Sequence, residues 1–363
     1  MTMISATEIE KKLNKVVDRM MVLKNSGMEE KFPVSLIDID CWEWPQGVGL
    51  FGLYKYYEIS KREDVLAFLL RWFDDRLAEG ISEKNVNTTA PMLTLTYLYE
   101  LTGDEAYYKL IEEWVRWIMD DKGLIRTGDD AFQHMITGDA NDGEILIDTI
   151  FMTLLFLARA GKILGRPDCI DEANYQILIH IKCLFDKKKG LFYHGFNFDF
   201  NHNYGEVYWN RGNSWYTSGI MEYLNEHTID AGIKRYLLNV YEDQVKAYQK
   251  YVDPTQGLWH TVIDDPTSYI ETSGSAGVLF GMMQGVRLGI LKGGEYRELI
   301  EKAMENILKY IDSDGTVLNV SYGTPIGDSA EFYKEIPICP MTYGQALMIL
   351  TLQEAMQSYW HET

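Results

Sequence analysis

Asp148 stands out among the ionisable residues because it lies within an apolar run, ILIDTIFM at 145–152. Desolvation by such neighbours disfavours a carboxylate, so we expect the pKa of Asp148 to be raised. A carboxyl group of that kind can donate a proton near neutral pH. The competing structural role is an N-cap, because aspartate before a helical apolar run is a favoured cap. The sequence supports the two roles about equally, and one does not exclude the other.

A second candidate is WNRGNSW at 209–215, whose composition suits neither a helix interior nor a strand. We expect Gly212 to let the backbone turn, Asn213 to cap the following helix, and Arg211 to face a cavity or the solvent. A guanidinium binds a carboxylate through two parallel hydrogen bonds, and an indole offers a flat apolar face to a sugar, so the segment suits a sugar acid. The structural alternative is that the tryptophans are core residues and that Arg211 pairs with a structural acid. The expected substrate-binding residues here are Trp209, Arg211, Asn213 and Trp215.

Three histidines end similar short motifs: His134 in AFQH, His194 in GLFYH and His260 in GLWH. A single histidine is usually structural, and the repetition modestly favours a functional position for all three. His134 and His194 are the ones we expect to bind substrate. No metal motif such as HExxH is present, so we expect neither a metal nor a cofactor. Trp44 and Asn87 stand at the starts of two apolar segments and would complete a ring of binding residues. Packing and N-capping are their competing roles.

These residues are distributed over a repeat of apolar segments that start at residues 46, 90, 149, 215, 273 and 342. Each segment has helical spacing but is apolar nearly all round, as in a buried helix. The segments between them, such as 104–121 and 294–311, have one polar face and predict outer helices. Glycines that follow these outer segments should end them in the left-handed conformation. They are Gly123, Gly190, Gly257 and Gly315.

Six inner helices that alternate with outer ones predict an all-α fold, an (α/α)6 toroid with short extended crossings. The first and last inner segments are as apolar as the middle ones, which favours closure over an open stack with polar capping repeats. We therefore expect one barrel domain spanning residues 1–363. Closure would place the candidate residues around a central cavity.

The charge balance narrows the possible partners, because 34 basic and 54 acidic residues give a formal net charge of -20. Such a charge repels nucleic acid phosphates and anionic membranes, so we expect neither as a partner. An anionic substrate would need local positive charge, which draws attention to Arg211. Four scattered cysteines and a start without a secretory pattern predict a reduced, cytoplasmic protein. The sequence does not indicate the oligomeric state.

A set of motifs in fixed order, from about residue 42 to 355, resembles the unsaturated rhamnogalacturonyl hydrolases of glycoside hydrolase family 105, and more distantly the unsaturated glucuronyl hydrolases of family 88. The motifs are WPQGVGLFGLY, NVNTTAPMLTLTYLYELTGD, ILIDTIFMTLLFLARAG, GLFYHGF, YWNRGNSW, GLWHTVIDDP, ETSGSA and MTYGQALMILTLQEA. The resemblance implies an (α/α)6 barrel that removes the unsaturated uronic acid left by lyases at the non-reducing end of pectin-like fragments. It implies that Asp148 is the catalytic acid and base, and that the pocket is lined by Trp44, His134, His194, Trp209 and Arg211. Asn87 is a departure, because many relatives carry an aspartate near this position.

The implied reaction can proceed with one essential carboxyl group. Ordinary glycosidases place two carboxyl groups across the bond, whereas an unsaturated uronide is a vinyl ether that one acid can protonate at carbon 4. Water then adds at carbon 5, and the hemiketal opens and expels the remaining sugar. Asp148 would give the first proton and take one back from water, while Asn87 positions water or hydroxyls. Two alternatives stay open: a two-carboxylate glycosidase that pairs Asp148 with Asp139, Asp142 or Glu271, and a non-catalytic toroid that binds carbohydrate or protein.

Overall fold

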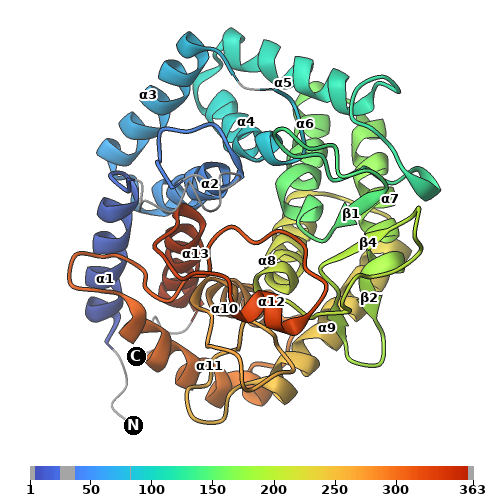
Figure 1. Ribbon diagram of the computed structural model, residues 1–363. Coiled ribbons are helices and arrows are strands. Elements are labelled where there is room, and N and C mark those ends of the chain that lie inside the picture. The colour runs from blue at the N-terminus through green and yellow to red at the C-terminus, as the bar shows by residue number, and fades with distance from the viewer. Residues whose placement is uncertain (1–4, 25–36, 82, 359–363) are drawn as a thin grey trace.

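The computed structural model describes residues 5–24, 37–81 and 83–358, which form two concentric rings of helices (Figure 1). The inner ring consists of α2 (Trp44–Ser60), α4 (Ala90–Thr102), the π-helical turn η3 (Ile150–Leu154) continued by α6 (Leu155–Leu164), α8 (Asn210–Glu226), α10 (Thr272–Arg287) and α13 (Thr342–Ser358). The outer ring consists of α1 (Ala6–Met20), α3 (Glu63–Glu79), α5 (Glu105–Met119), α7 (Pro167–Leu184), α9 (Ala231–Tyr251) and α11 (Gly293–Ile307). Inner helices contact one another in chain order, and α13 contacts α2. The ring closes, so the predicted (α/α)6 barrel is confirmed.

The division into inner and outer helices follows from which faces are apolar. In α2 every residue from 44 to 54 is buried, whereas α5 buries one face, made by Tyr107, Ile111, Trp114, Val115 and Ile118. Each outer helix therefore lays one face on an inner helix next to it in sequence, and α1 packs against α13. No described helix is both long and apolar enough to cross a membrane.

Three of the four glycines expected to end outer helices have the predicted left-handed conformation, although the helices before them already end at Leu184, Tyr251 and Ile307. Gly190, Gly257 and Gly315 have φ angles of 72°, 66° and 91°, in the left-handed region. Gly123 does not, and the prediction was wrong there. A Cβ at Gly123 would lie 1.8 Å from the carbonyl oxygen of Trp117, so close backbone approach requires the glycine instead.

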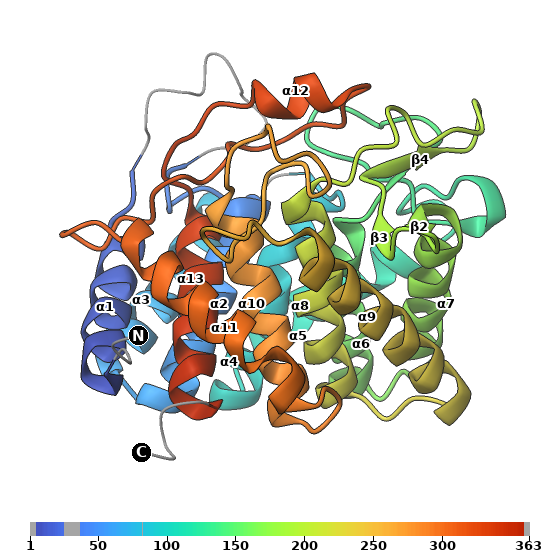
Figure 2. The ribbon, with the colours of Figure 1, turned by 90° about the horizontal axis from the view of Figure 1, so that it is seen from below.

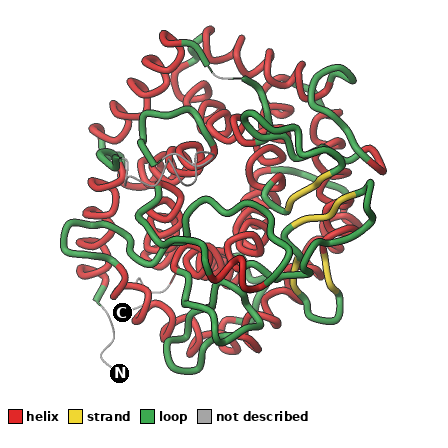
Figure 3. Tube along the Cα trace, viewed as in Figure 1, coloured by secondary structure: helices red, strands yellow, loops and turns green. Residues whose placement is uncertain are grey.

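Short antiparallel strands lie at one edge of the ring, while loops cross its centre (Figure 3). The strand β1 (Glu144–Leu146) pairs with β4 (Gly195–Asn197), and β2 (Phe185–Asp186) pairs with β3 (Leu191–Phe192). Immediately beyond the β1–β4 ladder, the Ile147 N–H donates to the carbonyl of His194 at 3.0 Å. This ladder holds the segment before η3 beside the segment before β4.

Shorter helical turns complete the described structure: η1 (Asn87–Thr89), η2 (Gly128–Asp130), η4 (Leu308–Tyr310) and α12 (Ala330–Lys334). Figure 2 shows α12, β4 and the long loops together at one end of the barrel, above the inner helices. The inner helices begin at this end.

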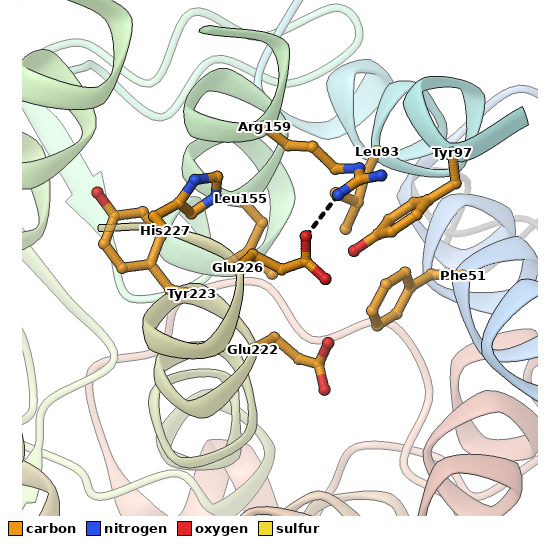
Figure 4. A pocket seen from close by; sticks show the side chains of 9 residues that line it. All are labelled: Phe51, Leu93, Tyr97, Leu155, Arg159, Glu222, Tyr223, Glu226 and His227. Carbon is orange, nitrogen blue, oxygen red and sulfur yellow. Dashed lines mark hydrogen bonds and ion pairs between the residues drawn. The ribbon is translucent and has the colours of Figure 1, made fainter. Parts of the chain in front are cut away.

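Toward the opposite end, side chains from α2, α4 and α6 and from the C-terminal part of α8 line a small pocket (Figure 4). Arg159 donates to Glu226 at 2.5 Å, also pairs with Glu100, and lies 3.4 Å from the ring centroid of Tyr97. The arginine is thus committed to structural partners. The residues predicted to bind substrate lie elsewhere, at the end where the inner helices begin.

Candidate active site

The starts of the inner helices bring most of the predicted residues to one end of the barrel. Trp44 is the first residue of α2, and Asn87 begins the turn that leads into α4. Asp148 lies two residues before η3, and Trp209 lies directly before α8. Each of the first four inner helices therefore supplies a side chain from its start to the same mouth.

Seven side chains at this mouth form a closed circuit, which we call the rim cluster: Trp44, Tyr343, Arg211, Trp209, His194, Asp148 and Trp215. Trp44 stacks on Tyr343 with ring centroids 4.7 Å apart. The Arg211 guanidinium lies 4.5 Å from the centroids of both Tyr343 and Trp209. The Trp209 ring lies 4.3 Å from that of His194. One half of the cluster is thus an aromatic sandwich around a buried cation.

The other half of the rim cluster holds Asp148. His194 Nε2 lies 3.5 Å from Asp148 Oδ2, and Trp215 Nε1 donates to Oδ1 at 3.1 Å. The Trp215 ring meets Trp44 edge-on, with centroids 6.3 Å apart, which closes the circuit. The Asp148 side chain is 13% exposed, so it is enclosed without being sealed off.

The N-cap role predicted for Asp148 was wrong. Its backbone carbonyl accepts from the N–H groups of Phe151 and Met152, but its carboxylate accepts from the Trp215 indole instead of the helix backbone. The following helix starts with a π-helical turn, η3, a feature that is frequent at functional sites. The carboxylate is therefore available for chemistry.

The prediction that the pKa of Asp148 is raised was also wrong. Burial raises the pKa, but interaction with His194, reinforced by His134 and Arg211, outweighs burial and holds it below the usual value. Burial lowers the pKa of His134 to about 4, so this imidazole is neutral at pH 7. In the unliganded protein Asp148 is a carboxylate at neutral pH.

His134 and Asn87 lie beside the rim cluster. His134 is 3% exposed, and its Nδ1 is 2.9 Å from Oγ1 of Thr149, the residue after Asp148. Asn87 is 8% exposed, and within the described ranges its side-chain amide makes no hydrogen bond. The turn η1 that carries Asn87 contacts η3. Asn87 thus retains unused donors and acceptors on a turn that contacts the helix after Asp148.

Arg211 does not face a cavity or the solvent, contrary to the prediction. It is 0% exposed, and its terminal nitrogens donate to the carbonyl of Ser321 at 3.0 Å, the carbonyl of Tyr322 at 3.1 Å and Oγ1 of Thr324 at 2.9 Å. A carboxylate oxygen of Glu271 lies 3.9 Å away. These contacts favour the alternative in which Arg211 pairs with a structural acid. Its hydrogen bonds hold the loop at 321–324 in place.

The WNRGNSW segment is helical from Asn210 onward, which also differs from expectation. A Cβ on Gly212 would lie 2.6 Å from Trp209 Cε3, so this glycine permits close packing instead of a turn. Asn213 exchanges two 2.7 Å hydrogen bonds with the backbone of Phe192 and donates to the Trp209 carbonyl. Asn213 lies inside α8, so its predicted role as cap was wrong. Its side chain is 1% exposed, which does not favour the expected contact with substrate. It fixes α8 to β3.

The acids proposed as second carboxylates are engaged elsewhere. Glu271 caps α10 through the N–H groups of Ser273 and Gly274. Asp139 and Asp142 are exposed on the loop after His134. Similarly, His260 contacts the Ser268 carbonyl and Asp253, so it does not share the position of the other two histidines. In the described part of the chain no group of three or more His, Cys, Asp or Glu could hold a metal ion.

Three site residues escaped the sequence analysis. Tyr343 starts the sixth inner helix, and the repeat itself could have identified it. Tyr333 lies on α12, outside the repeat, and carried no sequence signal. Glu43, in CWEWPQG, is 7% exposed, accepts from the Trp44 N–H at 2.7 Å and from Thr137 at 2.8 Å, and burial raises its pKa to about 7.

Comparisons with known proteins agree with this arrangement. Residues 12–359 match the family model described as Glycosyl Hydrolase Family 88. The unsaturated rhamnogalacturonyl hydrolase YesR of Bacillus subtilis is 28% identical over 96% of this chain and 96% of its own length. A possible member of the GH105 family from Salmonella enterica is 38% identical with a TM-score of 0.93, covering 98% of this chain and 95% of that one. A possible GH105 member from Klebsiella pneumoniae is 38% identical with a TM-score of 0.91, covering 98% and 94%. The chain is therefore a glycoside hydrolase and belongs to Glycosyl Hydrolase Family 88.

Proposed function

We propose that this hydrolase removes a 4,5-unsaturated uronic acid from the non-reducing end of lyase-generated oligosaccharides, with rhamnogalacturonan fragments as the favoured substrates. The observation that carries the proposal is the Asp148 carboxylate within the rim cluster, where Oδ2 lies 3.5 Å from His194 Nε2 and has no hydrogen-bond partner within the described ranges. A relative named for rhamnogalacturonyl hydrolysis that aligns over nearly the whole chain supports this substrate class.

Asp148 must be protonated to act as an acid, although its pKa is low in the free protein. A uronate carboxylate that enters beside it adds a second negative charge and offsets the nearby cations. Like charges disfavour ionisation, so substrate binding raises the pKa of Asp148 and promotes its protonation. Substrate binding therefore favours the protonated form of Asp148, which is the form that the first step requires.

The reaction then adds one water molecule overall. Asp148 transfers its proton to carbon 4, and the electrons of the double bond form the new C–H bond, leaving positive charge shared by carbon 5 and the ring oxygen. Water bonds to carbon 5 and gives a proton to the Asp148 carboxylate, which restores the acid. The bond from carbon 5 to the ring oxygen of the hemiketal breaks as the carbon 5 hydroxyl loses its proton and the ring oxygen gains one, giving a ketone at carbon 5 and a hydroxyl on carbon 1. The hemiacetal left at carbon 1 becomes an aldehyde as the remaining sugar departs.

The neighbouring residues have roles that suit this sequence. Trp44 and Trp215 present indole surface around the carboxyl group, and Trp215 orients it through the hydrogen bond to Oδ1. The buried charge of Arg211 attracts the uronate through the low-dielectric site, without the bidentate pair expected from the sequence. Asn87 supplies a neutral amide that can orient the attacking water.

A conventional two-carboxylate glycosidase is the second candidate, and one observation favours it. Glu43 is a buried carboxyl group at the same mouth, and its pKa of about 7 suits a general acid. Both oxygens of Glu43 already accept hydrogen bonds, which favours a role in holding the start of α2.

The free state of Cys41, Cys169, Cys183 and Cys339 supports a cytoplasmic location as part of the proposal.

The proposal is tested by incubating the protein with lyase-generated disaccharides from several polysaccharides and following loss of the conjugated ultraviolet absorbance. Saturated disaccharides with the same linkages serve as controls, and their turnover is measured as release of free uronic acid because they lack the conjugated double bond. We expect turnover only of unsaturated substrates, fastest with the rhamnogalacturonan product. Equal rates with saturated disaccharides would favour the two-carboxylate mechanism.

A further inference from the structure

Tyr333 reaches the catalytic centre from outside the barrel repeat. It lies on α12, the short helix above the mouth of the barrel (Figure 2), yet its side chain is only 1% exposed. Its hydroxyl lies 2.7 Å from Nδ1 of His194, and its ring lies 5.7 Å from the His194 ring. The Gly327 N–H donates to the same hydroxyl oxygen at 3.1 Å.

The number of protons on this hydroxyl determines the direction of the hydrogen bonds. A backbone N–H can only donate, so Tyr333 accepts from Gly327 and still has one O–H proton to give. Burial raises the pKa of Tyr333, so the hydroxyl keeps that proton at neutral pH. Within the described ranges, His194 Nδ1 is the partner placed to accept it. Nδ1 is then an acceptor and carries no proton.

A neutral imidazole has a single N–H, so an acceptor at Nδ1 places the proton on Nε2. His194 Nε2 is the nitrogen that faces Asp148 Oδ2 at 3.5 Å. Both atoms are buried, and neither has another hydrogen-bond partner among the described residues. The opposite tautomer would direct a lone pair at the carboxylate and leave the tyrosine proton without an acceptor.

We propose that Tyr333 is a positioning residue that selects the Nε2–H tautomer of His194, so that His194 presents a donor to Asp148 Oδ2. The functional consequence rests on the proposed role of Asp148 as proton donor. When Asp148 gives its proton to carbon 4, a carboxylate forms, and the His194 N–H is already directed at it. The donor stabilises the charge without moving a proton to the imidazole, which leaves Asp148 as the base for the attacking water.

The Tyr333→Phe variant removes only the hydroxyl and tests the assignment directly. Nitrogen-15 NMR of histidine-labelled protein, with His194→Gln identifying the signal, reports which ring nitrogen carries the proton. We expect a protonated Nε2 and an unprotonated Nδ1 in the unsubstituted protein, and a mixture of tautomers in Tyr333→Phe. We also expect kcat to fall about three- to tenfold, the scale of one net hydrogen bond, while KM changes less than about twofold.

Ser329→Ala is the matched control, because Ser329 caps α12 through the Phe332 N–H and does not touch His194. It loosens the same helix but leaves the Tyr333 hydroxyl in place, so it should preserve both the tautomer and kcat. An unchanged tautomer in Tyr333→Phe overturns the proposal, and so does an equal fall in kcat in Ser329→Ala. The NMR measurement needs no substrate, so failure of the proposed reaction would be recognised separately.

Discussion

Arg211→Ala should destabilise the fold, and its cost can be estimated from the contacts of the guanidinium. Arg211 is 0% exposed and donates to Ser321, Tyr322 and Thr324, which lie more than 100 residues away in sequence. Its truncation also leaves Glu271 buried beside a lost cation at 3.9 Å. Removing one partner of a buried charged pair typically costs about 3 to 5 kcal/mol. We therefore expect a loss of roughly 4 kcal/mol in the free energy of unfolding.

That loss is a large fraction of the stability of an ordinary domain, which is about 5 to 15 kcal/mol. Urea unfolding followed by tryptophan fluorescence measures it, and KM is measured on the same preparation. Arg159→Ala is the matched control, because Arg159 is also buried and paired but lies at the opposite mouth. We expect the control to lose stability with little change in KM, while Arg211→Ala loses stability and raises KM. A stable Arg211→Ala variant with severely weakened substrate binding would contradict the bracing role and restore the direct carboxylate clamp.

Two further predictions concern pH. If substrate raises the pKa of Asp148, kcat should fall at a higher pH than kcat/KM does on the basic side of the two pH profiles. The reason is that the pH dependence of kcat reports pKa values in the complex, whereas that of kcat/KM reports pKa values in the free protein. Basic limbs at the same pH would refute this prediction. Burial lowers the pKa of His180 from 6.5 to about 4, so the folded state binds fewer protons than the unfolded state between these values, and stability falls as pH decreases through this window. His180→Gln should reduce the slope of unfolding free energy against pH by about 1.2 kcal/mol per unit near pH 5, as measured by urea unfolding. An unchanged slope would show that His180 does not titrate as inferred.

The fold was predictable because its signals are local and repeated. An inner helix of this barrel is apolar on every face, whereas an outer helix is apolar on one face. The sequence alone therefore distinguishes the helices of the inner ring from those of the outer ring. Closure followed from the apolar character of the first and last inner segments, and contact between α2 and α13 confirms it. The starts of the inner helices also located Trp44, Asn87 and Asp148 at one mouth.

The electrostatics of the site were not predictable, because the relevant charges come from other elements. The sequence neighbours of Asp148 are apolar and indicated a raised pKa. Its spatial neighbours include His194 and Arg211, which lie 46 and 63 positions later in the sequence, and these residues lower the pKa of Asp148. Tyr333 could not be predicted as a site residue for a similar reason, because α12 lies outside the repeat.

The composition of WNRGNSW argues against a helix, yet the segment is helical from Asn210 onward. Its polar residues are buried and bonded within the fold, as the contacts of Arg211 and Asn213 show. Gly212 serves the packing of Trp209, a tertiary demand that spacing does not reveal. The polar residues of WNRGNSW therefore predicted the location of the candidate site correctly, but Arg211 and Asn213 hold the fold together where direct contact with substrate was expected.

The most direct test of the account compares Asp148→Asn with Glu43→Gln. Both substitutions keep the shape of a buried side chain at the same mouth while removing its ability to exchange a proton, and the amide oxygen introduced by Asp148→Asn would still accept the hydrogen bond from Trp215. We predict that Asp148→Asn unfolds near the urea midpoint of the unsubstituted protein but hydrates unsaturated disaccharides at least about a hundredfold more slowly. Glu43→Gln should retain most of its turnover. Substantial turnover in a well-folded Asp148→Asn, with loss of activity in Glu43→Gln, would contradict the assignment of Asp148 as the proton donor.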